Sequence, residues 1–399
     1  MKRFVCLILA VLMISGLPVF ADAGETLAPV NGNSAVSTAA SSLDTVASEA
    51  KSAILIEANT RTVLYEKDAD MALPPASVTK VMTMLLVMEA IDSGKISLSD
   101  TVTVSAYASK MGGSQVYLEE GEQMSVHELL KCVVVASAND ACVALAEHIA
   151  GSEEAFVSMM NARARELKME HTNFENTNGL DDDTQNHVIS ARDIATMSAE
   201  LIINHPKILE YSSIWMDSIR GGAFGLTNTN RLIRFYNGAN GLKTGSTSKA
   251  KFCISASAKR GNTQLICVVM GAPTRDVRNE IAKRLLDYGF ANYAYESFSG
   301  ANALEITKLP ITGAIETSVP ISTSDFCALV EKQNVGKTER TVTLPESLKA
   351  PIKAGDTVGT VKYTLNGQLL AEIPITAQST VERITFLQIF GQLLKEMLY

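Results

Sequence analysis

Residues 75–91 read PASVTKVMTMLLVMEAI, an apolar run of helical length that begins directly after Pro74. Proline shortly before a helix start is well tolerated, so this pattern predicts a buried helix over residues 78–91. Ser77 and Lys80 then lie one turn apart on the same face. The positive end of the helix dipole and a free backbone N–H at Ser77 suit a developing oxyanion.

Lys80 is followed by an almost entirely apolar segment. Burial disfavours the ammonium form and lowers the pKa of a lysine, as a general base requires. We therefore expect an acyl-transfer enzyme with Ser77 as nucleophile and Lys80 as base. The alternative, a capping serine and a surface lysine, does not explain the apolar run. Other Ser-x-x-Lys patterns, such as those at residues 246–249 and 248–251, lack this context.

Ser137 and Asn139 interrupt a second apolar stretch, which is predicted to be helical over residues 125–149. Polar side chains inside a buried segment need hydrogen-bond partners. A hydroxyl there can relay a proton, and an amide can hold a substrate amide. The alternative is a buried turn in which these side chains only form hydrogen bonds to backbone groups and have no role in catalysis.

Lys243, Thr244 and Gly245 stand at the predicted start of the last sheet strands. Glycine in a strand lets a ligand approach the backbone closely. Lys243 and Thr244 can bind a carboxylate, and Lys243 would lower the pKa of Lys80 if the two lie close together. The alternative for this motif alone is an exposed strand end.

The order of predicted elements indicates an α/β (α+β) catalytic domain over residues 49–295, with a mainly antiparallel sheet. A small β-rich domain over residues 300–378 follows it. The elements predicted for the first domain are strands at 53–56, 62–65, 252–256 and 265–270 and helices at 152–168, 191–204 and 275–288.

Both ends of the chain have their own character. Residues 1–23 combine a basic start, an apolar run and an Ala-x-Ala site, which predicts a cleaved signal peptide, with an uncleaved anchor as the alternative. Residues 24–48 are small and polar and predict a linker. Residues 382–399 form an amphipathic pattern too short and too polar to span a bilayer. We expect that helix to lie on a membrane, or else to dock on its own protein or a second copy.

The composition excludes several classes of protein. A net charge of −8 over 399 residues, with no basic patch, argues against nucleic acid as a partner. The histidines show no metal-ligand spacing, so no metal is expected. Five cysteines after Cys6 fit no disulfide framework. Cys253 and Cys267 flank a turn, and a bridge between them stays open.

The order SxxK, SxN and KTG, at residues 77, 137 and 243, resembles the penicillin-recognising serine enzymes. The likeness is greatest to the D-alanyl-D-alanine carboxypeptidases, the low-molecular-mass penicillin-binding proteins, and it covers nearly the whole chain. It implies a β-lactamase/transpeptidase-like catalytic domain with a helical subdomain, and no cofactor. Further matching stretches are residues 75–80, 178–181, 191–193 and 241–245.

The resemblance implies roles for the first two motifs. Ser77 would be acylated after Lys80 removes its proton. Ser137 would assist proton transfer and Asn139 would orient the substrate. The substrate would be a peptidoglycan stem peptide ending in D-Ala-D-Ala, and β-lactam antibiotics would bind at the same place.

The resemblance also implies a carboxylate site and an oxyanion hole. Lys243 and Thr244 would hold the terminal carboxylate beside Gly245. The oxyanion hole would use the backbone N–H groups of Ser77 and Ser246. Arg278 would assist with the carboxylate, although Arg275 is close to it in the sequence. The enzyme would work outside the cytoplasmic membrane, on whose outer face the C-terminal helix would rest.

Three alternatives to a carboxypeptidase remain. A class A-like β-lactamase would use Glu175 to activate water, but residues 175–178 are one residue short of the usual spacing. A D,D-endopeptidase would use the same residues on cross-linked peptides. An inactive wall-binding homologue would retain the fold without turnover.

Overall fold

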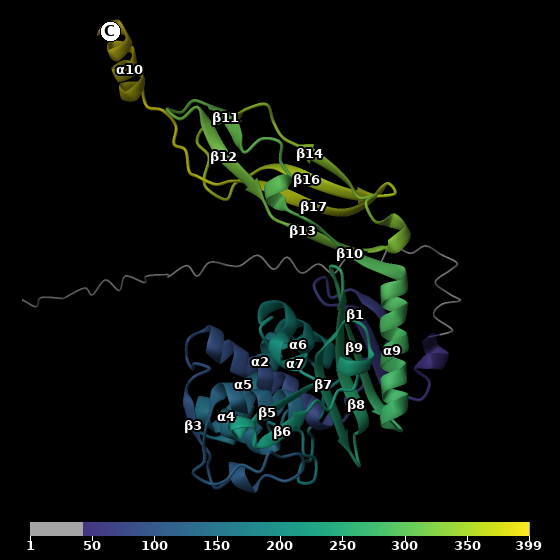
Figure 1. Cartoon of the computed structure of the whole chain (residues 1–399). Helices are drawn as coiled ribbons and strands as arrows, with labels where there is room; N and C mark the ends of the chain where they lie inside the picture. Colours follow the sequence, from purple (N-terminus) through teal and green to yellow (C-terminus); the bar gives the residue numbers. More distant parts are fainter. Residues whose placement is uncertain (1–42, 399) are drawn as a thin grey trace, which may run out of the picture.

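The structure is a computed structural model that describes residues 43–398, and the predicted signal peptide at 1–23 lies outside these residues. Two domains lie end to end, and a separate helix follows them (Figure 1). The first domain combines a five-stranded antiparallel sheet with helices, and the second is rich in β-strands. The α+β architecture predicted from the sequence is therefore confirmed.

The first sheet has the strand order β2-β1-β9-β8-β7, and all neighbours are antiparallel. The central strand β9 is buried along almost its whole length, since helices cover both faces, and its sequence is accordingly a continuous apolar run. The strands are β1 (Ser52–Glu57), β2 (Val63–Lys67), β7 (Ala239–Thr247), β8 (Lys251–Arg260) and β9 (Thr263–Ala272).

A helical subdomain covers one face of this sheet. Its central helix is α2 (Lys80–Asp92), which is buried nearly all round and packs against α4 and α6. The other elements on this side are β3 (Thr101–Thr103), β4 (Gln123–Ser125), α3 (Val126–Lys131), α4 (Asn139–Ala150), α5 (Glu153–Glu166), α6 (Ala191–Asn204), α7 (Ile208–Ser212), β5 (Met216–Ile219) and β6 (Phe224–Thr227). The short helix α8 (Leu232–Phe235) contacts β7, and its Leu232 packs in the core on the other face of the sheet.

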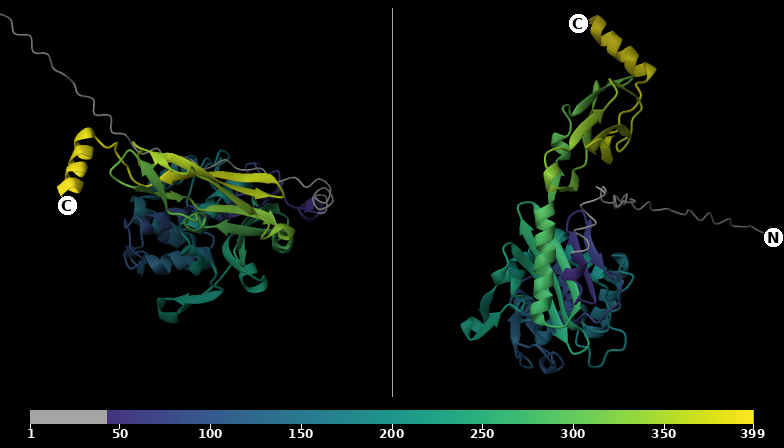
Figure 2. Two further views of the ribbon diagram at one scale, coloured as in Figure 1. Left: turned by 90° about the horizontal axis from the view of Figure 1, so that it is seen from above. Right: turned by 90° about the vertical axis from the view of Figure 1, so that its right-hand side faces the viewer.

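The long helix α9 (Arg275–Asn292) covers the opposite face and leads directly into the second domain (Figure 2). A short helical turn at residues 43–46 packs into the same core, where Leu43 and Ala47 are buried. The predicted linker at 24–48 is therefore wrong from residue 43 onward. Leu43 and Ala47 are spaced four apart, which brings both side chains to one face of the turn.

The two candidate cysteines do not form a bridge. Cys267 pairs with Ala256 across the β8–β9 hairpin, so Cys253 is not its register partner. Cys253 packs in the core under the helical subdomain, whereas Cys267 packs under α9 on the other face. Every cysteine among the described residues is a free thiol.

The second domain contains a six-stranded sheet of order β14-β16-β17-β12-β11-β15 and the pair β10–β13. Strand β10 starts two residues before the predicted end of the catalytic domain at residue 295, so that boundary is corrected to Asn292. The strands are β10 (Tyr293–Phe298), β11 (Lys308–Thr312), β12 (Ser318–Thr323), β13 (Phe326–Glu331), β14 (Glu339–Thr343), β15 (Leu348–Lys349), β16 (Thr357–Leu365) and β17 (Gln368–Ala377).

The last helix, α10 (Phe386–Leu398), projects away from both domains (Figure 1). It starts four residues later than the predicted segment 382–399. Its apolar side chains are exposed, with Phe386 at 78% and Met397 at 83%, so the helix is not docked on the rest of the described chain. Within residues 43–398, no helix combines the length and the apolar character that crossing a membrane requires.

Candidate active site

Ser77 and Lys80 lie where a short 3₁₀ turn, η1 (Ala76–Thr79), becomes the helix α2. The predicted helix start is thus a tighter turn than an α-helix. Side chains three residues apart eclipse one another in 3₁₀ geometry. Lys80 Nζ consequently donates a hydrogen bond of 3.0 Å to Ser77 Oγ, and the structure brings together the nucleophile and base predicted from the sequence.

The ammonium group of Lys80 is completely buried and has three hydrogen-bond acceptors. These are Ser77 Oγ, Asn139 Oδ1 at 2.6 Å and the backbone oxygen of Asn178 at 2.7 Å. Burial lowers the pKa of Lys80 to about 8, although the nearby Cys142 and Asp140 act in the opposite direction. The predicted direction of this pKa shift is confirmed, and neutral Lys80 is accessible near neutral pH.

The second motif lies at the predicted interruption of the helix. A π-helical turn, η3 (Cys132–Ala136), ends at Ser137, whose φ of 64° is left-handed, and α4 begins at Asn139. Asn139 contacts Lys80 directly, while the bonds of Lys80 within residues 43–398 do not include the Ser137 hydroxyl. The Asn139 amide also donates to the Gly112 carbonyl at 2.7 Å. That loop was not predicted, because its contact uses only backbone oxygen.

Lys243 lies in the middle of β7, not at the start of a strand as predicted. Its side chain is buried, and Nζ donates to the backbone oxygen of Thr244 at 2.8 Å. Desolvation holds the pKa of Lys243 well below its usual value, and the charges of Lys80 and Arg278 add to this effect. Repulsion between the two lysines is thus one cause of the lowered pKa of Lys243.

Strand β7 approaches the nucleophile turn closely at Gly245. A side-chain carbon at this position would lie 2.8 Å from the backbone nitrogen of Ser77 and 2.8 Å from the Pro75 carbonyl. Only glycine fits this gap, which sets the Ser77 N–H beside the exposed end of β7 at Ser246. Thr244 Oγ1 donates to Thr229 Oγ1 at 2.8 Å on the same edge of the strand.

Arg278 lies in the first turns of α9 and is buried, with 2% of its surface exposed. Its guanidinium donates to the Asn279 side chain and to the Cys253 carbonyl. Burial lowers the pKa of Arg278 to about 10. The charge of Arg278 acts on Lys243, so the two side chains are near neighbours, while the guanidinium itself is engaged by Asn279 and Cys253.

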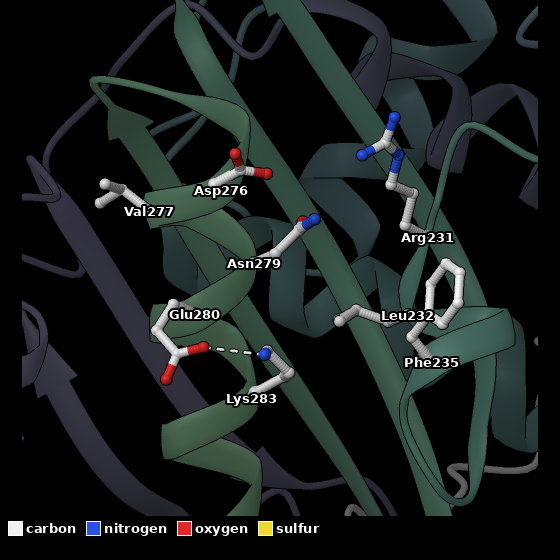
Figure 3. Close-up of a pocket in the computed structure, with 8 residues that line it drawn as sticks. All are labelled: Arg231, Leu232, Phe235, Asp276, Val277, Asn279, Glu280 and Lys283. Atoms are coloured by element: carbon white, nitrogen blue, oxygen red, sulfur yellow. Dashed lines mark ion pairs between the residues drawn. The ribbon is translucent and has the colours of Figure 1, made fainter.

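A surface hollow of about 450 Å³ lies between α8 and α9 (Figure 3). Asn279 and Arg231 point toward it, and a Glu280–Lys283 ion pair of 2.8 Å borders it. None of the predicted site residues lines this hollow. Ser77, Asn139 and Lys243 lie elsewhere, at the junction of η1, α4 and β7.

The segment from Glu175 to His187 completes the site. Its Asn178 carbonyl binds Lys80, and the Asp181 carboxylate accepts a hydrogen bond from Thr247 beyond the end of the KTG motif. Residues 178–181 were noted in the sequence as a matching stretch. Their contact with Lys80 was not predicted, because a backbone carbonyl leaves no mark in the pattern of side chains. Glu175 is exposed and accepts the backbone N–H groups of Gln185 and Asn186, each at 2.9 Å. That carboxylate thus holds the segment in shape.

Comparison with known proteins places these features in context. Residues 36–274 match the family model described as D-alanyl-D-alanine carboxypeptidase. Residues 302–383 match the model described as penicillin-binding protein 5, C-terminal domain. A curated relative, the D-alanyl-D-alanine carboxypeptidase DacF of Bacillus subtilis, is 42% identical over 86% of this chain and 89% of its own length.

Two solved structures resemble the chain to different extents. Penicillin-binding protein 5 of Haemophilus influenzae has a TM-score of 0.73 at 32% identity, over 84% of this chain and 98% of that one. Penicillin-binding protein D2 of Listeria monocytogenes, solved in an ampicillin-bound form, has a TM-score of 0.56 at 32% identity. That match covers 61% of this chain but 97% of the Listeria chain.

Proposed function

The chain belongs to the D-alanyl-D-alanine carboxypeptidase family, and on this premise we propose that it removes the terminal D-alanine of peptidoglycan stem pentapeptides through an acyl-enzyme on Ser77. The chain is a serine-type carboxypeptidase of this family, and the proposal concerns its substrate and mechanism. The observation that carries it is the set of three hydrogen bonds that fixes Lys80 beside Ser77.

Acylation begins when neutral Lys80 accepts the hydroxyl proton of Ser77. The Ser77 oxygen attacks the carbonyl carbon of the penultimate D-alanine, and the negative charge moves to the carbonyl oxygen. The backbone N–H groups of Ser77 and Ser246 stabilise that oxyanion. The C–N bond then breaks, and the amine of the departing D-alanine receives a proton from Lys80 through the Ser137 hydroxyl.

The carboxylate of the terminal D-alanine is held by cationic and hydroxyl groups of β7. Lys243 supplies positive charge, and Thr244 supplies a hydroxyl donor. Arg278, which lies in α9, adds to the positive potential at this place. Asn139 orients the peptide amide on the other side of Ser77. Beside Gly245 the substrate backbone can approach the strand.

Deacylation transfers the acyl group to water, and Lys80 again accepts the proton. A β-lactam follows the acylation route, with Ser77 attacking the lactam carbonyl and the lactam C–N bond opening. The amine of the opened ring stays tethered to the acyl group, so its departure does not clear the site for water. We therefore expect penicillin to label Ser77 covalently and durably.

A β-lactamase is the second candidate, and the contacts of Glu175 disfavour it. Both of its carboxylate oxygens are engaged by backbone N–H groups ten and eleven residues further along the chain. A carboxylate used in this way is not free to activate a deacylating water. A D,D-endopeptidase uses the same chemistry on a cross-linked peptide, and substrate choice decides between the two.

We further propose that the enzyme works outside the cytoplasmic membrane, with α10 resting on the outer face of the bilayer. Support comes from the signal-peptide pattern in residues 1–23 and from the exposed apolar side chains of α10, which include Leu387 at 79% exposed. Such a helix gains free energy by burying its apolar face in the interface. The stem peptide and β-lactams are the expected partners, without cofactor or nucleic acid.

The decisive experiment measures D-alanine released from a pentapeptide ending in D-Ala-D-Ala, beside a cross-linked dimer. We expect release from the pentapeptide, and fluorescent penicillin should label wild-type protein but not Ser77→Ala. Faster cleavage of the dimer would favour the endopeptidase. Rapid turnover of penicillin would favour the β-lactamase, and absence of label on wild type would contradict the acyl-enzyme.

A further inference from the structure

We propose that His187 is a positioning residue that fixes the Ser77 turn through the hydroxyl of Thr79. The inference rests on the proposed function, because Ser77 is taken as the nucleophile. Within residues 43–398 the ring nitrogens of His187 bond to Thr79 and Glu175, not to Ser77 or Lys80, so its effect on the reaction passes through Thr79.

The hydrogen bonds around His187 define the tautomer of its ring. The backbone N–H of Glu175 donates to Nδ1 at 3.0 Å, so Nδ1 is an acceptor and the proton is on Nε2. Nε2–H then donates to Thr79 Oγ1 at 2.8 Å. The Thr79 hydroxyl in turn donates to the carbonyl of Ala76 at 2.8 Å. A single chain of bonds therefore runs from residue 175 to the nucleophile turn.

The two ends of that chain enclose the nucleophile. Ala76 directly precedes Ser77, and Thr79 directly precedes Lys80. Ala76 has a φ of 49°, a left-handed conformation that a residue with a side chain rarely adopts. Neighbouring groups must stabilise this unfavourable backbone conformation. One of them is the Thr79 hydroxyl, whose hydrogen bond to the Ala76 carbonyl lies within the turn itself.

Packing leaves little room for any other arrangement. His187 is 4% exposed, and the ring of Phe174 meets it edge-on at 5.9 Å between centroids. At Gly179 a side-chain carbon would lie 1.9 Å from the Ala76 oxygen, so this backbone presses directly on the turn. The imidazole of His187 thus packs directly against the turn η1 and limits where that turn can move.

Burial also keeps His187 neutral, as the bond pattern requires. Desolvation lowers the pKa of His187 to about 4, while the carboxylates of Glu175 and Asp181 oppose that shift. A neutral ring can accept at Nδ1 and donate at Nε2 at the same time. A protonated ring would lose the bond from Glu175.

The same segment reaches both halves of the nucleophile–base pair. Asn178 gives its carbonyl to Lys80, and His187 holds the turn of Ser77. A small movement of this segment would change the Ser77–Lys80 geometry, and misplacement by about 1 Å can lower a rate about 10²-fold. A role limited to folding would instead reduce stability without a specific effect on turnover.

A matched pair of variants separates these possibilities. His187→Asn keeps an acceptor near the Nδ1 position but cannot reach Thr79, whereas His187→Gln keeps a donor near Nε2 and loses the Glu175 bond. Each loses one hydrogen bond, so similar falls in Tm are expected. We expect kcat and the rate of penicillin acylation to fall about 10²-fold in H187N with KM nearly unchanged, and about threefold in H187Q.

A second pair tests the same bond from the other side, in case the histidine variants do not fold. Thr79→Val removes the hydroxyl at constant shape and should match H187N, whereas Thr79→Ser retains the hydroxyl and should retain most of the activity. Equal kcat values within either folded pair overturn the positioning role. Wild-type protein that neither releases D-alanine nor accepts penicillin would instead contradict the proposed function itself.

Discussion

The catalytic domain and the C-terminal β domain bury different kinds of side chain. The first encloses Lys80, Lys243 and Arg278, each at most 2% exposed. In the second, over residues 293–398, the described side chains that are fully buried are apolar or aromatic, such as Tyr363 stacked on Phe326. Burying a cation is unfavourable without partners, so the catalytic domain must supply hydrogen-bond acceptors to these groups, whereas the core of the β domain rests on apolar and aromatic packing.

The largest test of this contrast replaces one lysine in each domain. Lys80→Ala should lower D-alanine release and penicillin acylation by about 10³-fold, because the general base is lost. Lys362, which pairs with Glu372 at 3.3 Å on the exposed face of the β domain, serves as the control. Lys362→Ala should leave activity unchanged and alter stability by about 0.5 kcal/mol or less. Steady-state kinetics with chemical denaturation would check both, and equal losses would remove the contrast.

The next test compares two glycines. Gly245→Ala places a carbon 2.8 Å from the backbone nitrogen of Ser77, so the nucleophile turn must move, and we expect activity to fall about 10²-fold. Gly336→Ala meets nothing within 4 Å, and its only strain is a φ of 75°. That change should lower stability by about 1 kcal/mol and leave kcat/KM unaltered. A fully active G245A would show that the close approach is not needed.

The pH dependence of acylation gives a third test. Because burial lowers the pKa of Lys80 to about 8, the neutral base is the minor form below that pH. The rate of penicillin acylation should rise about tenfold per pH unit up to about pH 8 and then level off. A profile that is flat from pH 5 to 8 would exclude Lys80 as the base.

The same shift affects stability. The unfolded chain binds more protons than the folded one between pH 8 and the ordinary lysine pKa of 10.5, so the free energy of unfolding should rise with pH across that window. Lys80 should contribute about 3 kcal/mol to this rise. Lys80→Met should lack that contribution, whereas Lys362→Met should behave like wild type.

The smallest effect concerns separation of the domains. A chain ending at Asn292 retains every predicted site residue, and the Listeria structure is matched almost in full by a comparable share of this chain. We expect kcat/KM on a soluble pentapeptide to stay within about threefold of the full chain. A large loss in a well-folded truncation would mean that the β domain contributes to the site.

Prediction from sequence succeeded where side-chain pattern carries the information. The apolar run behind Lys80 predicted both the buried helix and the lowered pKa. The packed turn at residues 43–46 was hidden by its Ala- and Ser-rich surroundings. The first residues of β10 were included in the catalytic domain because this strand continues directly from α9.

The residues of the candidate site that were not predicted contact it through backbone carbonyls or through partners far away in the sequence. Asn178 binds Lys80 with its backbone carbonyl, and Gly112 binds Asn139 in the same way. His187 is a single histidine whose partner, Thr79, lies far away in the chain. Such contacts depend on how loops fold back over the helices, which periodicity and motif spacing do not report.

The strand order of the first sheet has a consequence for the way the chain folds. Strand β1 pairs with β9 in a register that joins Ser52 to Met270, so the sheet cannot close until nearly the whole catalytic domain has been synthesised. Pairings between strands far apart in the sequence slow folding. The chain loses the conformational entropy of a long loop before the new contacts offset that loss. Until then β1 can pair only with β2, and its other edge stays open, so a ribosome-bound or translocating chain should depend on chaperones that shield this edge.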